Sequence, residues 1–178
     1  MTIDKLKFYL QRIYRLSLSV QKQELIVWKD LKNLHQEAKW KSGIYEKEKT
    51  IETSFEICDG RQETFYYVLY DGYYYCAVKV LKNFPTELTT DIFILAAHFN
   101  NLLNNGVVVI NVNGGYVEYR QKRELLIPLL YGGDTYEQMM CHYNTTKDIY
   151  SAFNRLIEEQ EAPAIIIADL LNNNSEMP

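Results

Sequence analysis

The chain contains few residues that could supply metal-binding chemistry, and their spacing does not favour it. The three histidines are His35, His98 and His142. A metal site needs such side chains to converge with a carboxylate or a thiolate. No two of these histidines stand four residues apart, as a pair on one face of a metal-binding helix would. Surface or partly buried histidines are the default interpretation, so we expect no metal site and no cofactor.

Nucleophilic chemistry has no sequence signature either. The cysteines Cys58, Cys76 and Cys141 are odd in number and scattered, with no CxxC spacing, so we expect neither a disulfide framework nor a zinc site. No serine stands in a GxSxG turn. An anion could bind at the helix start after Gly133, but Asp134 would repel it and no P-loop lysine is present. We therefore expect no catalytic residue and no enzyme.

Tyrosine is the most distinctive residue type, with 15 in 178 residues. The densest run is 64–81, where Asp71-Gly72 between two β-rich segments predicts a two-residue hairpin turn. A strand with one wet face alternates apolar and polar residues, and this hairpin does not. One predicted face carries Phe65, Tyr67, Leu69, Tyr74, Cys76, Val78 and Val80, with Cys76 as a buried inert thiol, and the other carries Tyr66, Val68, Tyr70, Tyr73, Tyr75, Ala77 and Lys79.

The second face must therefore be covered, either by another element of the chain or by a partner. Core or subunit interface and a peptide-binding surface are the two main interpretations, because tyrosine buries a large ring and keeps a hydroxyl for a wet edge. Base stacking in an RNA-binding sheet is a third. It is disfavoured because only Lys79 shares the face and the net charge is −4. The predicted protein-binding residues are Tyr66, Val68, Tyr70, Tyr73 and Tyr75.

The elements before this hairpin are predicted from periodicity. Ile3, Leu6, Leu10 and Ile13 recur at helical spacing and predict a short amphipathic helix. A second helix is predicted from about residue 20, ending near Gly43. Leu16, Leu18 and Val20 alternate, so residues 14–45 either form helix throughout or include a strand. Residues 51–58 alternate as a strand that leads into the hairpin.

The elements after the hairpin begin with a helix that Pro85 opens and Gly106 closes as a left-handed cap. A second hairpin follows over about 107–125 with its turn at Asn113-Gly114. Asp134 and Glu137 have capping-box spacing for a last helix of about 25 residues, which Pro163 ends. Residues 164–171 form either a turn of helix or an edge strand, and 172–178 a disordered polar tail.

This order predicts an α+β fold, with an antiparallel sheet of about five strands in the order βββ-α-ββ-α, helices on one face and an N-terminal helical segment. We expect one α+β domain over 1–171, of which 1–45 is the helical N-terminal part. Hydrophobic residues make up 47% of the chain and charged residues 24%, which are ordinary globular values.

The element order resembles the YbjN family and its fold relatives, the type III secretion chaperones. The resemblance covers roughly the last 130 residues and is closest from Ile94 to Ile157. The segments that carry it are the helix 96–103 (AAHFNNLL), the strand after Gly106, the turn at 113–115 (NGG), the strand 116–120 (YVEYR), the loop 132–135 (GGDT) and a helix with 148–150 (DIY). The N-terminal helices depart from the compact pattern, and no functional residue carries over.

The resemblance implies a non-enzymatic, cytoplasmic, dimeric protein, whose chaperone relatives bind extended segments of other proteins. We accordingly expect a homodimer that binds another polypeptide, with no nucleic acid partner. We also expect no membrane partner, because no segment approaches the ~20 apolar residues that span a bilayer. The alternative is a small-ligand protein or enzyme with a pocket between sheet and helices, using His98 or His142.

Overall fold

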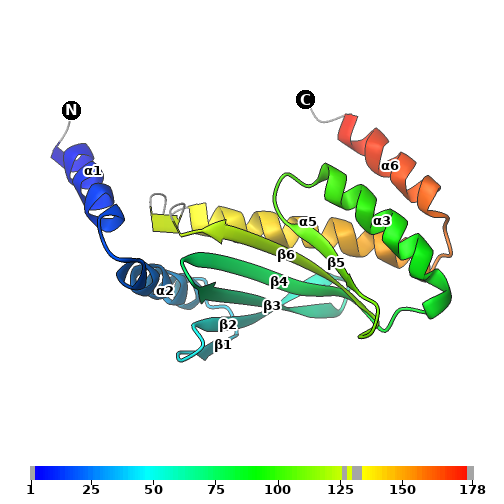
Figure 1. Ribbon diagram of the computed structural model, residues 1–178, viewed down its shortest axis with the longest axis horizontal. Helices are drawn as coiled ribbons and strands as arrows, with labels where there is room; N and C mark the ends of the chain where they lie inside the picture. The colour runs from blue at the N-terminus through cyan, green and yellow to red at the C-terminus, as the bar shows by residue number, and fades with distance from the viewer. Residues whose placement is uncertain (1–2, 126–127, 130–133, 176–178) are drawn as a thin grey trace. The chain divides into compact units, whose positions relative to one another are not determined.

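The computed structural model describes residues 3–125, 128–129 and 134–175 and has an α+β fold (Figure 1). Its antiparallel sheet has six strands in the order β1-β2-β3-β4-β6-β5. The strands are β1 (Ser42–Tyr45), β2 (Thr50–Cys58), β3 (Arg61–Tyr70), β4 (Tyr73–Lys82), β5 (Val107–Asn111) and β6 (Tyr116–Glu124). The helices are α1 (Ile3–Leu16), α2 (Val20–Glu37), the short 3₁₀ helix η1 (Thr86–Leu88), α3 (Thr89–Leu102), α5 (Asp134–Ile157) and α6 (Pro163–Ser175).

The chain divides into two compact units, and each is described by itself. The first comprises Met1–Ser54, Phe65–Cys76 and Lys122–His142, and the second comprises Phe55–Thr64, Ala77–Gln121 and Tyr143–Pro178. In the first unit, α2 packs on the hairpin, where the rings of His35 and Tyr67 meet edge to face at 5.5 Å. In the second unit, α3 and α6 lie side by side (Figure 1), and Phe99 of α3 stacks on Phe153 of α5.

The N-terminal region is two helices and then a strand that the sequence did not predict. The break at residues 17–19 separates α1 from α2, so the alternation of Leu16, Leu18 and Val20 is not a strand. The prediction that the second helix ends near Gly43 is wrong. Lys39 adopts φ 55°, and the amides of Lys39 and Trp40 donate to the carbonyls of Gln36 and His35. This Schellman motif ends α2 at Glu37, and the released chain forms β1.

The tyrosine hairpin has the predicted turn. Asp71 and Gly72 both have positive φ, 50° and 75°, which is what a type I′ turn requires and why a glycine stands there. The predicted inner face is confirmed, because all seven of its residues are buried: Phe65, Tyr67, Leu69, Tyr74, Cys76, Val78 and Val80. Burial of large aromatic rings on one side of the sheet is therefore the main contribution of this hairpin to the core.

The second hairpin has the predicted register, with Asn111 opposite Tyr116 and Val108 opposite Tyr119. Asn113 and Gly114 lie in the loop between the strands. The predicted role of Gly106 is wrong, because α3 already ends at Leu102 and Leu103 leaves it in an extended conformation. Gly106 has φ 95°, and a Cβ there would lie 2.7 Å from the carbonyl oxygen of Arg120. The glycine thus permits close approach of the chain to β6.

The C-terminal region ends in two helices, so the helical alternative for residues 164–171 is confirmed and the edge strand is wrong. The long helix α5 spans 24 residues, but it ends at Ile157, before Pro163. That proline is the first residue of α6, a position where its missing N–H costs nothing. Residues 164–171 are therefore helical, and so are 172–175 of the predicted disordered tail. Gly132 and Gly133 lie outside the described residues.

We predict that the three cysteines differ sharply in reactivity. Cys58 and Cys141 are exposed and free, whereas Cys76 is buried. Burial raises the pKa of the Cys76 thiol to about 12, so almost no thiolate, the reactive form, exists there at pH 8. A chromogenic disulfide reagent should label Cys58 and Cys141 in the native protein within minutes, and Cys76 only in denaturant. Rapid native labelling of a Cys58→Ser/Cys141→Ser variant would contradict the burial of Cys76.

Candidate functional site

The five predicted binding residues all lie on the outer face of the β3–β4 hairpin, within the first unit. Tyr66, Val68, Tyr73 and Tyr75 are half-buried, and Tyr70 at the turn is 68% exposed. This face is therefore neither a second core nor a fully wet surface. It is a patch of tyrosine side chains, with one valine, that remains partly open to solvent. We call Tyr66, Val68, Tyr70, Tyr73 and Tyr75 the tyrosine face.

A lysine from β6 orders part of the tyrosine face. The Lys122 ammonium lies 3.6 Å from the centroid of the Tyr73 ring and 5.6 Å from that of Tyr75. The two rings are themselves 6.2 Å apart at an interplanar angle of 56°. A cation over an aromatic face is attracted by the ring quadrupole, so Lys122 favours one orientation of these rings. Only Lys79 was predicted on this face, and Lys122 was not. Lys122 reaches this face because β6 lies next to β4 in the sheet. These two strands are far apart in the sequence.

The turn at the end of the hairpin is held by a buried carboxylate from α2. Glu24 is 8% exposed, and its Oε1 accepts a hydrogen bond of 2.9 Å from the Gly72 amide. Its Oε2 forms an ion pair with Lys49. The Lys49 carbonyl in turn accepts a 3.0 Å hydrogen bond from the Leu69 amide. One side chain thus connects α2, the 46–49 loop and the hairpin turn; we call it the Glu24 clamp.

The charge state of the clamp follows from its contacts. Burial alone would raise the pKa of Glu24, but the hydrogen bonds from Lys49 and Gly72 outweigh it and hold the pKa below 4.5. The carboxylate is therefore ionised at neutral pH. Beside the clamp lies a cleft of about 390 Å³ lined by Glu24, Lys47, Glu48, Lys49, Leu69, Tyr70 and Asp71. This cleft adjoins the most exposed ring of the tyrosine face.

We predict that Glu24→Gln lowers the free energy of unfolding by about 1–3 kcal/mol at pH 7, because a buried ion pair loses one partner. A lowered carboxyl pKa contributes stability that is present above pH 4.5 and lost as pH falls through the folded-state pKa. The difference between wild type and variant should therefore shrink in acid. Urea unfolding at pH 7 and at pH values below 4.5 measures it.

The matched control for this prediction is Glu48→Gln, since Glu48 is an exposed carboxylate of the same cleft. Its loss should change the free energy of unfolding by less than about 0.5 kcal/mol. If Glu24→Gln behaves like Glu48→Gln at pH 7, the clamp does not stabilise the turn.

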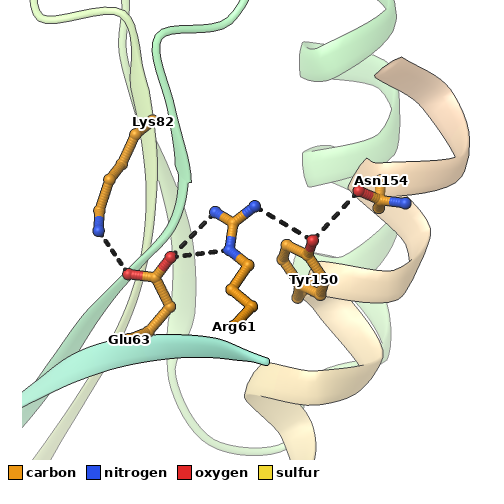
Figure 2. Close-up of polar contacts among 5 residues, drawn as sticks. All are labelled: Arg61, Glu63, Lys82, Tyr150 and Asn154. Carbon is orange, nitrogen blue, oxygen red and sulfur yellow. Dashed lines mark hydrogen bonds and ion pairs between the residues drawn. The ribbon is translucent and has the colours of Figure 1, made fainter. Parts of the chain in front are cut away.

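A second polar cluster lies in the second unit, and Figure 2 shows it. The Glu63 carboxylate, 3% exposed, lies between two cations. Lys82 Nζ is 2.6 Å from it, and Arg61 donates to it at 2.9 Å. Arg61 also donates to the Tyr150 hydroxyl at 3.1 Å, and that hydroxyl donates to Asn154 at 3.2 Å. The Arg61 guanidinium is 4.4 Å from the Tyr150 ring centroid. The cluster joins β3, β4 and α5.

This cluster adjoins a cleft of about 360 Å³, lined by Ile57, Cys58, Lys147, Asp148, Tyr150, Ser151, Asn154, Arg155 and Glu159. Burial, followed by the hydrogen bond with Cys58, raises the pKa of Tyr150. Tyr150 therefore stays protonated at neutral pH and is a hydrogen-bond donor, not a base. Arg155 is paired with both Glu161 and Asp169 at 2.6 Å. Two carboxylates thus neutralise Arg155, which suits a structural role better than proton transfer.

The three histidines do not come together as a site. His35 is buried on α2, its Nδ1 is 2.8 Å from the Leu31 carbonyl oxygen, and burial lowers its pKa below 6.5. His142 is buried with its ring edge to face on Phe65 at 5.6 Å, and His98 is half-buried on α3. In the part of the chain that the structure describes, no three His, Cys, Asp or Glu residues are placed to bind a metal ion.

Comparison with protein-family models, with curated proteins and with solved structures gave no significant match. The resemblance to the YbjN family therefore stays a prediction from the element order. Across the described residues, no helix has the length and apolar character needed to cross a bilayer.

We predict that Glu63→Gln costs about 1–2 kcal/mol of unfolding free energy, because it leaves Arg61 without its carboxylate partner while Arg61 remains partly hydrated. Lys82→Gln is the matched control. Its side chain is 53% exposed, and exposed ion pairs contribute little, so its cost should stay below about 1 kcal/mol. Equal costs in urea unfolding would show that Glu63 is not the centre of the cluster.

Proposed function

We propose that this chain is a non-catalytic protein-binding module, with a chaperone-like or regulatory role, that holds an extended polypeptide on the tyrosine face. The observation that carries the proposal is the partial exposure of five adjacent large side chains above a completely buried inner face. Tyrosine and valine on a rigid sheet contribute contact area at little cost in side-chain entropy. The resemblance to the YbjN family and to type III secretion chaperones supports the same class of function.

An edge of the sheet in the same unit supports the extended form of the ligand. β1 is the last strand on its side of the order, and it pairs with β2 from Ser42 to Tyr45. Its Ile44 and Tyr45 are 37% and 46% exposed. An extended peptide can add to such an edge through main-chain hydrogen bonds, with side-chain contacts providing the selectivity. We propose that β1 and the tyrosine face together contact the bound segment.

The proposal includes homodimerisation through the same aromatic surface and a cytoplasmic location. An aromatic patch with a mixed polar rim is typical of interfaces that associate reversibly. All three cysteines are free, which suits a reducing compartment. Two copies and a bound polypeptide then compete for the tyrosine face, so self-association should weaken when peptide is bound.

A second candidate is a small-ligand protein that uses the cleft beside Tyr150. The observation in its favour is that Cys58, Lys147, Asp148 and Asn154 all line one cleft of about 360 Å³. This set differs from the predicted His98 and His142. In a Cys141→Ser variant, alkylation of Cys58 blocks this cleft and leaves the tyrosine face intact, so it separates the two candidates in any binding assay.

We predict that Tyr70→Ser/Tyr73→Ser folds cooperatively but loses binding. Both side chains are outside the core, so the thermal midpoint should change by only a few degrees. Loss of two aromatic contacts should weaken association at least tenfold. Sedimentation velocity measures self-association over a range of concentrations, and selection from random 12-residue peptides followed by fluorescence anisotropy measures peptide binding.

The control is Tyr136→Ser, which removes a tyrosine that is 45% exposed but lies on α5, stacked on Trp40. It should leave association unchanged. An unchanged monomer for both wild type and double variant, together with no selected peptide, would refute the proposed function.

A further inference from the structure

The helix α1 presents an apolar face that the fold leaves uncovered. Leu6, Tyr9, Leu10, Ile13 and Tyr14 are between 43% and 64% exposed. At 3.6 residues per turn these side chains occupy an arc of about 140° on one side of the helix. The predicted amphipathic helix is thus present, but its apolar side does not face a core. A contiguous apolar surface of this kind indicates an interaction site.

The side of α1 opposite the apolar arc carries basic residues together with Phe8, which is 50% exposed, and Asp4 precedes them in the helix. Between Leu6 and Leu16 the sequence contains Lys7, Arg12 and Arg15 and no aspartate or glutamate. By helical geometry, Lys7 and Arg12 stand at the two boundaries of the apolar arc. The Arg12 guanidinium lies 3.7 Å from the centroid of the Phe8 ring, and Arg15 pairs with Asp30 of α2 at 3.6 Å. Cations at the edges of an apolar arc are typical of helices that lie in a lipid interface.

The N-terminal sequence around α1 is also positively charged. Residues 1–35 contain seven lysines and arginines against three acidic residues, although the whole chain has 19 against 23. The exposed side of α2 also combines apolar and basic residues, with Leu25 59% exposed and exposed Lys22 and Lys29 on the same side of the helix. The rest of the chain is acidic. An anionic surface would attract the N-terminal helices and repel the remainder, which defines an orientation.

We propose that α1 is an interfacial helix that binds the surface of anionic phospholipid membranes. The apolar arc enters the boundary between headgroups and acyl chains, and the exposed Lys7 extends to the lipid phosphates. The expectation of no membrane partner rested on the absence of a spanning segment, which a helix lying flat on the surface does not need.

Two other occupants fit the same face less well. A second copy would offer another helix about 21 Å long, and one face of such a helix presents roughly 200–400 Å², below the ~800 Å² per partner of a standard interface. That face would also bring basic residues against basic residues. Nucleic acid would use the cations but leave the apolar arc wet. An anionic lipid surface pairs with the cations of α1 and also removes its apolar arc from water.

Polar contacts hold the C-terminal end of α1 beside α2. Besides the Arg15–Asp30 pair, the Gln23 amide donates to the carbonyls of Arg15 and Leu16 at 3.4 and 3.1 Å. The Ser17 hydroxyl donates to the Tyr14 carbonyl at 2.8 Å. These contacts hold the end of α1 near α2 and leave its apolar arc open.

The test is co-sedimentation of the full chain with extruded vesicles of phosphatidylcholine alone or with 30% phosphatidylglycerol. We expect at least tenfold tighter binding to the anionic vesicles, and at least fivefold weaker binding in 0.5 M than in 0.1 M NaCl. Leu10→Glu/Ile13→Glu should abolish binding, because it places two carboxylates in the apolar arc. Gln11→Glu, one carboxylate on the polar side of the same helix, should retain most of it. Both variants should unfold at the wild-type temperature.

A positional reporter tests the orientation directly. Tyr14→Trp, in the apolar arc, should shift its emission to shorter wavelength on anionic vesicles, and Gln11→Trp, on the polar side, should not. Equal binding to both kinds of vesicle, or no binding, would overturn the proposal. So would vesicle binding that survives Leu10→Glu/Ile13→Glu. A third outcome is that the wild type does not bind vesicles and that Leu10→Glu/Ile13→Glu abolishes self-association in sedimentation velocity. The α1 face then binds a second copy of the chain, and the lipid proposal fails.

Discussion

A buried carboxylate near the start of α2 organises the surface that carries the proposed function. Glu24 accepts from the Gly72 amide and pairs with Lys49, so the hairpin turn, the 46–49 loop and α2 share one side chain. A buried acid is stable in its charged form only when such donors surround it. The clamp therefore sets the position of the turn, and with it the position of Tyr70 and the cleft beside it.

The hairpin has two faces that differ in burial although both are aromatic. The inner face is closed to water, with Tyr67 against His35 of α2, while the tyrosine face remains half open. Rigidity on one side and partial exposure on the other is what a binding surface needs, because the rings are ordered before the ligand arrives. Lys122 adds to that order from β6. The polar cluster around Glu63, in contrast, is saturated with its own partners.

The proposed peptide surface and the proposed lipid surface differ in their charge and in the shape of their apolar area. The tyrosine face lies on a sheet, and its tyrosine side chains are half-buried or exposed. The α1 face is a narrow apolar arc bounded by cations, without a carboxylate between Leu6 and Leu16. An arc of this kind matches a fluid interface that requires no shape complementarity. A peripheral module that captures polypeptides at an anionic surface would use both.

The sequence by itself determined those features that depend on neighbours along the chain. The Asp71-Gly72 turn follows from the need for positive φ at two positions, and the inner face and the second hairpin's register follow from the two-residue period of strands. Periodicity could not predict β1, because the left-handed residue that ends α2 is Lys39 instead of a glycine. Lys122 over Tyr73 and Glu24 on Gly72 were decided by tertiary structure alone, since strand order and helix packing join residues distant in sequence. The exposure of α1 was also decided by tertiary structure. An amphipathic pattern shows that a helix has an apolar side, but only packing shows whether anything covers that side.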